Sequence, residues 1–498
     1  MKGGPNMMTR SRNALGALLA LLCALALLPM TPASAVSGQS QLTASSAPRT
    51  WHVVVGGQSQ DRAIQAEGYY PRVISIDAGD TVVWTLNTAE LHSVTFTGTC
   101  PDISCVPPCV FAVNIDVSPC GPTSYDGVSA IASSGRMVAA GYNWNNSYPH
   151  GDTTYALTFT NAGVNVYFDL SVSGMRGVVV VNPAGTPYPF TQTQYSEQAR
   201  DQMRSDLEAG ARARQDFQPI DTSTHPGGSH IHHVALGTSP PETARVALDS
   251  VGGSNAKGNA LLEGLGVGPS PNPTIAVRVS LSGLRPGSVH AVQILAGVCG
   301  SPAPTTGLLF NSIFPHPTFT LNNITAGPDG RATSTTILTQ PPNLNGPGQL
   351  RIPSAGWFVN VAAGATADDG VSSAACGNVV FHNASVMRYL PQTVHVRVGD
   401  TVEWTNDTIN EVHGVTFLAA QALPLIPDWF MNAPSGNPTS YDGSSLLNSG
   451  PLYGADAGRN HSFAVTFTKA GTFPYVDVGD AVLGMKGTVV VVAPEVSD

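Results

Sequence analysis

"GDTVVWTLNTAELHSVTF", residues 79–96, decides the fold of this chain, because a close copy, "GDTVEWTNDTINEVHGVTF", occupies residues 399–417. Three further blocks repeat in the same order. They are "PTSYDG" at 122 and 438, "LTFTNAGVNVY" at 157 with "VTFTKAGTFPY" at 465, and "GMRGVVVV" at 174 with "GMKGTVVVV" at 484. Four blocks in one order indicate two copies of a single domain.

The repeated blocks have the pattern of β-strands. "RVISI" (72–76) and "TVVWTL" (81–86) alternate around the turn at 78–80, which predicts a hairpin. This hairpin would supply four side chains to a core: Ile74, Ile76, Val82 and Trp84. The valine runs 178–181 and 489–492 are typical of a strand buried on both faces. Short strands separated by Gly and Pro predict a β-sandwich for each copy.

The composition supports an ordered, turn-rich protein. Only 11% of the 498 residues are charged, against about 25% in ordinary globular proteins, and there are 52 Gly and 39 Pro. A hydrophobic fraction of 42% excludes a disordered chain. The formal net charge of -10 argues against nucleic acid as a partner, because phosphate binding needs a basic surface.

The first 35 residues have the pattern of a signal peptide. Basic residues precede an apolar stretch at 14–28, and Ala33-Ser34-Ala35 fits a cleavage site. No later run approaches the roughly 20 apolar residues of a transmembrane helix. We therefore expect a secreted or extracytoplasmic protein of the periplasm or cell envelope, without a transmembrane segment. The six cysteines outside the leader indicate three disulfides in such a compartment.

The segment between the two copies contains the one predicted helix, at 195–217. Ala199, Met203 and Leu207 form an apolar stripe, and Ser196 is the expected N-cap, so 192–229 is predicted to be a helical linker. A third unit, 230–386, again alternates like β-strands. Its start, "HHVALG" (232–237), is similar to "WHVVVGG" (51–57), which leaves open whether the middle unit is inserted into the second copy.

The Gly-Asp-Thr-Val-x-Trp block, the His before Val-Thr-Phe and the Tyr-to-Met-x-Gly loop resemble the cupredoxin superfamily, which includes plastocyanin and azurin. The resemblance covers 51–183 and 387–493. It implies an all-β chain with two cupredoxin-like Greek-key β-sandwiches and one short linker helix. It also implies membership of a copper-binding, electron-carrying superfamily.

The resemblance assigns candidate metal ligands in both copies. His92 and His413 match the first copper imidazole, and Met175 and Met485 match the axial sulfur. The remaining ligand positions hold other residues: Asp169 and Asp477 replace the thiolate, and Val172 and Asp480 replace the second imidazole. A blue copper site needs that thiolate, so neither copy can build one.

Two interpretations of these positions remain. In the first, imidazole and carboxylate hold a non-blue Cu(II) or Zn(II) ion. Its ligands would be His92, Asp169 and Met175 in the first copy and His413, Asp477, Asp480 and Met485 in the second. In the second, both copies have lost the metal, each Met packs in the core, and each Gly of the Met-x-Gly loop sets a turn.

In the middle unit, "SGLRPGSVHAVQILAGVC" (282–299), "AGWFVNVAAG" (355–364) and "AACGNVV" (374–380) resemble the copper-zinc superoxide dismutase fold and the chordin-type (CHRD) domain. The resemblance implies a central β-sandwich or barrel and a disulfide between Cys299 and Cys376. Of the copper histidines only His290 remains, and Ala362 stands where a later one would be. Dismutase catalysis is therefore not expected, and His290 is interpreted as structural.

Two other clusters could be mistaken for metal sites. The insertion 100–120 contains Cys100, Cys105, Cys109 and Cys120. Their spacing lacks paired Cys-x2-Cys units, so we predict two local disulfides of unknown pairing. "HPGGSHIHH" (225–233) is interpreted as a solvated linker, although His230 and His232 would share a strand face and could share a metal.

These patterns predict an exported protein of cupredoxin type that binds a metal ion weakly or in a non-blue site and does not transfer electrons. The cofactor is either non-blue copper or none. The alternative is a metal-free extracellular scaffold or binding protein with an unidentified partner. A superoxide dismutase is the least favoured function, and the residues offer no other catalytic arrangement.

Overall fold

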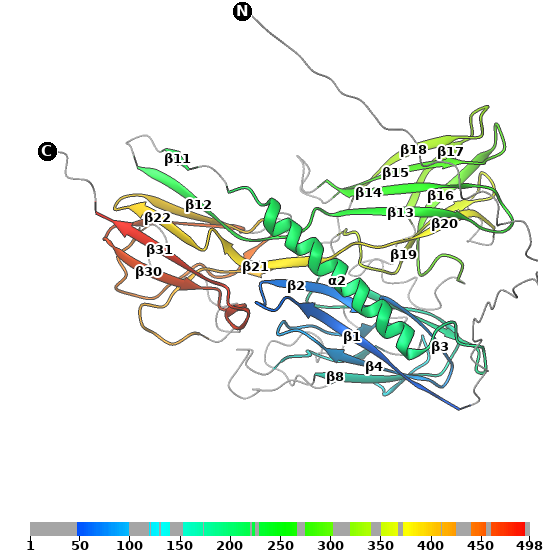
Figure 1. The fold of residues 1–498 in the computed structure, drawn as a ribbon, viewed down its shortest axis with the longest axis horizontal. Helices are drawn as coiled ribbons and strands as arrows, with labels where there is room; N and C mark the ends of the chain where they lie inside the picture. The colour runs from blue at the N-terminus through cyan, green and yellow to red at the C-terminus, as the bar shows by residue number, and fades with distance from the viewer. Residues whose placement is uncertain are drawn as a thin grey trace, which may run out of the picture. The chain divides into compact units, whose positions relative to one another are not determined.

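The computed structural model describes the residues 47–98, 119, 121–128, 131–139, 153–172, 174–219, 222–224, 229–265, 274–301, 319–339, 350–366, 372–409, 411–424, 440–454 and 460–493. They form β-sheets, one long α-helix and one short 3-10 turn (Figure 1). The predicted all-β fold with a single helix is therefore confirmed over these ranges. The signal peptide and the four cysteines of the 100–120 insertion lie outside the described residues.

The first copy is a sandwich of two sheets. Its strands are β1 (Thr50–Gln58), β2 (Ile64–Tyr70), β3 (Val73–Asp77), β4 (Thr81–Leu86), β5 (Thr95–Phe96), β6 (Ser124–Tyr125), β7 (Ala132–Ser133), β8 (Thr154–Phe159), β9 (Gly163–Phe168) and β10 (Arg176–Asn182). One sheet contains β2-β1-β4-β8-β6 and the other β3-β10-β9-β5-β7. Aromatic side chains, among them Trp84, Phe96 and Tyr167, fill the core between them.

The predicted hairpin at 72–86 is wrong, although its core residues are right. Strand β3 pairs in parallel with β10, whereas β4 lies in the opposite sheet beside β1 and β8. The four predicted core side chains are fully buried: Ile74, Ile76, Val82 and Trp84. Alternation identifies the side that faces the core but not the sheet to which a strand belongs. The Asp80 carboxylate stabilises the turn by which the chain passes from β3 in one sheet to β4 in the other. It accepts hydrogen bonds from the backbone N–H of Asp77 and the indole N–H of Trp51.

The second copy repeats this arrangement with β12 as its first strand. Its strands are β11 (Ser223–Thr224), β12 (His230–Thr238), β21 (Ala384–Leu390), β22 (Thr393–Arg397), β23 (Thr401–Thr405), β24 (Val412–His413), β25 (Thr416–Phe417), β26 (Ser440–Tyr441), β27 (Leu447–Asn448), β28 (Leu452–Tyr453), β29 (Ser462–Phe467), β30 (Gly471–Val476) and β31 (Lys486–Val492). Strand β12 pairs antiparallel with β21 and parallel with β23, as β1 does with β2 and β4. Along the chain, the strands of the middle unit therefore lie between β12 and β21, which are neighbours in the sheet of the second copy. The domain limits drawn from the sequence stay predictions.

The two copies share one continuous sheet. Its order is β26-β29-β23-β12-β21-β2-β1-β4-β8-β6. Counted outward from the central β21–β2 pair, the strands of one copy therefore occur in the same order as the equivalent strands of the other. Strands β2 and β21 run antiparallel, with Gln65 opposite Ser385 and Ala66 opposite Ala384. The order has the internal symmetry of a two-fold axis through this pair, and the junction between the copies is made by main-chain hydrogen bonding as well as by side chains.

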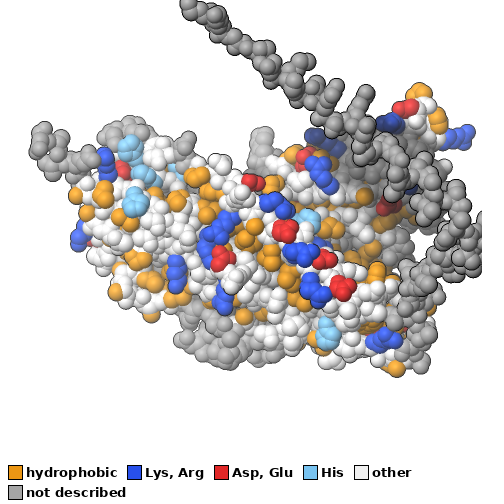
Figure 2. Space-filling view, viewed as in Figure 1, with side chains coloured by type: hydrophobic (Ala, Val, Ile, Leu, Met, Phe, Trp, Pro, Cys, Tyr) orange, Lys and Arg blue, Asp and Glu red, His pale blue; other side chains and the backbone are white. Residues whose placement is uncertain are grey.

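Helix α2 (Gln192–Asp216) covers the junction. Thr191 is its N-cap and forms a capping box with Gln194, so the predicted cap at Ser196 is wrong; the Ser196 hydroxyl instead donates to the Gln192 carbonyl. The predicted stripe is confirmed, since Ala199, Met203 and Leu207 pack against Ala66 and Tyr70 of β2. Figure 2 shows basic and acidic side chains over the region that α2 crosses in Figure 1. The helix is thus a packed element of the junction and more than a linker.

A buried ion pair ties α2 to the first copy. Asp206 has no solvent exposure, and its carboxylate accepts hydrogen bonds from Arg72 Nη2 at 2.6 Å, from the Tyr70 hydroxyl at 2.6 Å and from His382 Nδ1 at 2.8 Å. The Arg72 side chain is only 5% exposed. These bonds offset the cost of burying both charges.

The middle unit is an eight-stranded sheet. Its strands are β13 (Thr243–Ser250), β14 (Lys257–Gly264), β15 (Thr274–Ser282), β16 (Val289–Ala296), β17 (Phe319–Thr325), β18 (Ala332–Thr339), β19 (Trp357–Ala362) and β20 (Ser373–Val379). Hydrogen bonds from Asn322 on β17 to Thr335 and Thr336 on β18 join the two ends of the sheet. The implied Cys299–Cys376 disulfide is present. His290 is structural, because its ring nitrogens bond the Ala362 carbonyl and the Ser288 hydroxyl, each at 2.8 Å.

The valine-rich last strands differ between the copies. In β10, Val178 packs beside Val298 of the middle unit while Val179 faces the first core, so both faces are covered as predicted. In β31, Val489 and Val491 are buried but Val492 is 48% exposed. The prediction of two buried faces is therefore wrong for the second copy, where alternate side chains remain on the surface.

Replacing Asp206 by Asn should lower the free energy of unfolding by about 3–5 kcal/mol, because Arg72 would keep its buried charge without a counter-charge. Urea unfolding followed by tryptophan fluorescence measures this loss. Asp201→Asn, which breaks the exposed Arg204–Asp201 pair on the same helix, is the control and should cost less than about 1 kcal/mol. Equal losses in the two variants would contradict the assignment.

Candidate metal centre

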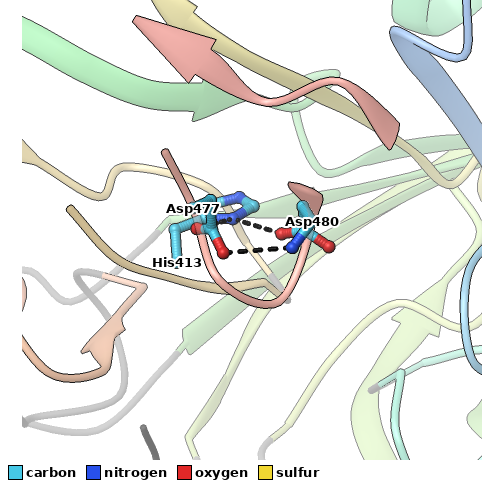
Figure 3. A group of neighbouring side chains, drawn as sticks. All are labelled: His413, Asp477 and Asp480. Carbon is cyan, nitrogen blue, oxygen red and sulfur yellow. Dashed lines mark hydrogen bonds and ion pairs between the residues drawn. The ribbon is translucent and has the colours of Figure 1, made fainter. Parts of the chain in front are cut away.

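Three ligand groups of the second copy converge at one buried point (Figure 3). His413 Nδ1 lies 2.9 Å from Asp480 Oδ2 and 3.4 Å from Asp477 Oδ2. One ligand atom from each of the three residues lies within 4.8 Å of the other two. His413 and Asp477 have no solvent exposure, and Asp480 is 7% exposed.

Two chain segments position this cluster. His413 ends β24, which pairs with β28, and the two aspartates follow β30 in the loop before the 3-10 turn Ala481–Leu483. The backbone N–H of Asp477 donates to the Met485 carbonyl at 3.1 Å, which closes the loop. The predicted association of His413 with both aspartates therefore agrees with the observed geometry.

The two aspartates differ in their remaining capacity to accept hydrogen bonds. Asp477 accepts from the backbone N–H groups of Gly414, Gly479 and Asp480, at 2.6, 2.7 and 3.1 Å. Asp480 accepts a hydrogen bond only from His413 among the described residues. Because a carboxylate offers about four lone-pair directions, Asp480 keeps acceptor positions for a cation.

At neutral pH the His413 side chain is the positively charged imidazolium, with a proton on both ring nitrogens. Burial lowers the pKa of His413, but hydrogen bonds to Asp477 and Asp480 and their negative charges outweigh burial and raise the pKa to about 10. Burial and the charge of Asp477 raise the pKa of Asp480, against the opposing effect of His413. A metal ion at Nδ1 would have to displace the proton on that nitrogen, so its binding must weaken as the pH falls.

In the corresponding site of the first copy, the aspartate beside the histidine is fully occupied by hydrogen bonds. His92 Nδ1 lies 2.8 Å from Asp169 Oδ2, and both side chains are buried. Asp169 also accepts from the backbone N–H groups of Ser93, Ser171 and Val172, at 3.1, 2.6 and 3.3 Å. Val172 packs in the apolar core where the second copy has Asp480. The two copies therefore share a His–Asp pair and differ by one carboxylate.

The methionines of the Met-x-Gly loops are buried in the apolar cores, and the glycines lie against tyrosine rings. Met175 and Met485 have no exposure and belong to the two apolar cores. The prediction that Gly177 sets a turn is wrong: a Cβ there would lie 2.4 Å from the Tyr167 ring, and Gly487 is similarly placed against Tyr475. In each copy the glycine makes room for a buried tyrosine.

Two glutamates near the histidines were not singled out from the sequence. Glu90 and Glu411 each precede the site histidine by two residues, so Glu-x-His recurs in both copies and was the available signal. Burial, with the negative charges of Glu67 and Asp480, raises the pKa of Glu90 well above its usual value. Burial raises the pKa of Glu411 in the same way, with Glu90 and Glu67 adding to the rise and His413 opposing it.

The histidine-rich segment is part of a strand. Residues 230–233 begin β12, and Figure 2 shows histidine side chains gathered at this end of the molecule. His232 Nε2 lies 3.3 Å from Asp400, and His233 Nδ1 lies 3.3 Å from Glu403. The interpretation of this stretch as a solvated linker is therefore wrong from residue 230 onward, because pairing with β23 fixes it in the sheet.

Comparison with known proteins gives partial structural similarities. No family model and no curated protein sequence matches the chain. An oxidized methionine-to-leucine mutant of amicyanin is 27% identical over 21% of this chain and 73% of its own, with a TM-score of 0.15. A mutant plastocyanin of fern is 21% identical over 21% of this chain and 89% of its own, with a TM-score of 0.14. TM-scores of this size do not establish a family. No helix in the described ranges is long and apolar enough to cross a membrane.

Metal-free protein should lose stability as the pH rises from about 6.5 to 10. The pKa of His413 is raised in the folded state above its ordinary value of 6.5, so its stabilising effect is complete below pH 6.5 and disappears as the pH passes about 10. One pKa unit corresponds to about 1.4 kcal/mol, so the loss should reach a few kcal/mol. Urea unfolding of EDTA-treated protein across this range measures it. Asp480→Asn should flatten the profile, and identical slopes in the two proteins would contradict the assignment.

Proposed function

We propose that this protein is an exported, cupredoxin-like protein that binds a divalent metal ion in the second copy without blue-copper electron transfer. The single observation that carries the proposal is the convergence of His413, Asp477 and Asp480 at a buried point where Asp480 keeps free acceptor positions. Imidazole and carboxylate donors suit Cu(II) and Zn(II). The repeated sequence blocks and the two-layer sheets support the cupredoxin-like assignment of both copies.

The residues present fit such an ion but exclude the blue type. His413 Nδ1 and the two carboxylates would hold it, and the buried Met485 belongs to the same loop. The metal would supply a bound positive charge in place of the imidazole proton. Because an aspartate stands at the thiolate position, the described site offers no sulfur anion for the charge-transfer band or the electron path of a blue centre.

The geometry of the first copy favours a second candidate function for that copy, namely a structural domain without metal. Asp169 is saturated by His92 and by backbone donors, and Val172 replaces the additional carboxylate. We extend the scaffold function to the middle unit, whose sheet contains β13 to β20 and which we propose to be dismutase-like in fold. His290, the copper histidine that remains, is fully occupied by hydrogen bonds there.

An extracytoplasmic location is part of this proposal. The Cys299–Cys376 disulfide supports it, because such bonds persist in oxidising compartments. The signal-peptide pattern and the remaining four cysteines, which lie outside the described residues, are its other supports.

Cu(II) added to the purified protein should bind at the second copy. The bound Cu(II) should give an electron paramagnetic resonance signal, and the protein should show no intense visible absorption band. Asp480→Asn should weaken Cu(II) binding at least tenfold, because it removes the carboxylate with free acceptor positions. Isothermal titration at pH 8 measures the affinity. Circular dichroism checks that the variant is folded.

Two control variants locate the effect. Asp442→Asn removes an exposed carboxylate of the second copy and should leave the affinity unchanged. Asp169→Asn alters the first-copy counterpart of Asp477 and should also leave Cu(II) binding at the second copy unchanged. Unchanged affinity in a folded Asp480→Asn variant, or a blue protein, would refute the proposal and favour the scaffold.

A further inference from the structure

The short 3-10 turn Ala481–Leu483 directly follows the candidate metal ligand Asp480. The carbonyl oxygen of Asp480 accepts hydrogen bonds from the backbone N–H groups of Leu483 at 3.0 Å and Met485 at 3.2 Å. Among the described residues, the Asp480 carboxylate accepts a hydrogen bond only from His413. The position of this carboxylate therefore depends on where the turn is held.

Two arginines bind the carbonyl oxygens at the end of this turn. Arg388 Nη1 donates to the Leu483 carbonyl at 2.8 Å. Arg62 Nη1 donates to the Val482 carbonyl at 3.2 Å. The last carbonyl groups of a helical turn have no partner within the turn, and basic side chains can supply one. The turn is therefore fixed by charged side chains from outside its own segment.

Both arginines attach the turn to the first copy. Arg62 belongs to the first copy itself, in the loop between β1 and β2. Arg388 lies on β21 of the second copy, and its Nη2 donates to the Asp61 carbonyl of that loop at 2.5 Å. Arg388 Nη1 also donates to the Met387 carbonyl at 2.6 Å, and Arg388 is only 8% exposed. One guanidinium group thus joins a segment of each copy.

Apolar side chains connect the same segments. Ala89 of the first copy, Met387 of β21 and Leu483 of the turn form one buried cluster, and Val482 packs against it. The backbone N–H of Met387 donates to the Ala63 carbonyl of the first copy at 2.8 Å. The turn after the metal ligand therefore packs on the first copy as well as on its own copy.

The arginine on the central strand is present only in the copy that has the additional carboxylate. Arg388 precedes Tyr389 in β21, whereas Gly68 precedes the equivalent Tyr69 in β2. Each of these tyrosine hydroxyls donates to the carbonyl of the residue that follows the site histidine, so the two positions correspond in structure. The first copy thus lacks the arginine, and it has an apolar side chain where Asp480 stands in the second.

We propose that Arg388, together with Arg62, is a positioning residue through which the first copy affects metal binding at the second-copy site. The inference rests on the proposed function, because it concerns the same group of His413, Asp477 and Asp480. The bonded arginines hold the turn where Asp480 lies beside His413. Two binding events that favour one arrangement strengthen each other by the same factor. A bound cation should therefore strengthen the contact between the copies, as this contact strengthens cation binding.

Isothermal titration of Cu(II) into the full chain at pH 8 tests this role. Arg388→Met removes the hydrogen bonds of the guanidinium but keeps a long apolar side chain, and it should weaken Cu(II) binding by about tenfold. Charge alone predicts the opposite change, because loss of a positive group near the site favours a cation. Arg388→Lys keeps the charge but lacks the planar fork that binds several carbonyls at once, so its affinity should lie between the two.

Two further variants locate the effect. Arg62→Met removes one hydrogen bond to the turn and should weaken Cu(II) binding less than Arg388→Met does. Arg214→Met is the matched control, because it removes an arginine that pairs with the Asp61 carboxylate at the same junction, and it should leave the affinity unchanged. Circular dichroism checks that each variant is folded. If Arg388→Met does not fold, the difference between Arg62→Met and Arg214→Met decides the question.

Hydrogen exchange measured by mass spectrometry gives a result that a merely structural role would not change. Saturating Zn(II) should slow amide exchange in residues 59–66 of the first copy, because a stabilised turn holds this loop through the two arginines. In Arg388→Met, saturating Zn(II) should slow exchange in the second copy alone. Saturation removes the difference in affinity between the two proteins from this comparison.

The results separate this inference from the proposed function. The inference is overturned, and the metal site stands, if wild-type protein binds Cu(II) through Asp480 while folded arginine variants bind as tightly or more tightly. It is also overturned if Zn(II) leaves exchange in residues 59–66 unchanged. Absence of Cu(II) binding in the wild type refutes the proposed function and this inference with it.

Discussion

The antiparallel pairing of β2 with β21 is the constraint on which the rest of the structure depends. It joins two copies of one sequence pattern into a single sheet, with Gln65 opposite Ser385 at the centre. Neither strand is left as an exposed edge, which would otherwise be free to pair with another chain. Helix α2 then has one continuous surface to cover, and its contacts with Ile64 and Ala384, close to Gly210, come from both copies. The buried charges of Asp206 and Arg72 are tolerated because this packing holds their partners in place.

The same pairing produces the unusual polar interior. Thr88, just before the first Glu-x-His segment, donates a hydrogen bond to Gln65, and Ser385 donates one to Glu411 of the second segment, so each segment is bonded to one of the two paired central strands. His92 is held through Nδ1 by Asp169, and His413 is held through Nδ1 by Asp480, with Asp477 at 3.4 Å. In the metal-free state a proton on His413 supplies the positive charge that a metal would otherwise bring. Under the proposed function a cation would replace that proton, so its binding would weaken at low pH.

The difference between the copies follows from one position. Val172 belongs to the apolar core of the first copy, whereas the equivalent Asp480 lies beside His413 in the second. Asp169 of the first copy and Asp477 of the second both accept hydrogen bonds from three backbone N–H groups, so neither aspartate distinguishes the copies. The second copy retains a carboxylate with open acceptor positions. A duplicated domain can in this way keep its packing in both halves while its chemistry differs between them.

Much of this arrangement could be predicted from the sequence, because it depends on local patterns. The repeat and the turn-rich composition are read directly from the sequence. Periodicity predicts the apolar stripe of α2 and the core positions Ile74, Ile76, Val82 and Trp84. Resemblance to known families supplied the His413–Asp477–Asp480 group and the Cys299–Cys376 bond. The partner of β3 could not be predicted, because alternation gives the buried side of a strand and not its sheet.

What only the tertiary structure decided concerns contacts between segments far apart in the chain. The chain order alone does not say that β12 belongs to the second copy or that β2 pairs with β21. Those facts depend on which sheet edges meet, and that choice is made by the total burial and hydrogen bonding of the whole molecule. By itself the sequence determined two sandwich-forming copies without a thiolate. Their assembly decided that β2 and β21 would pair, so that the two copies share one sheet beneath helix α2.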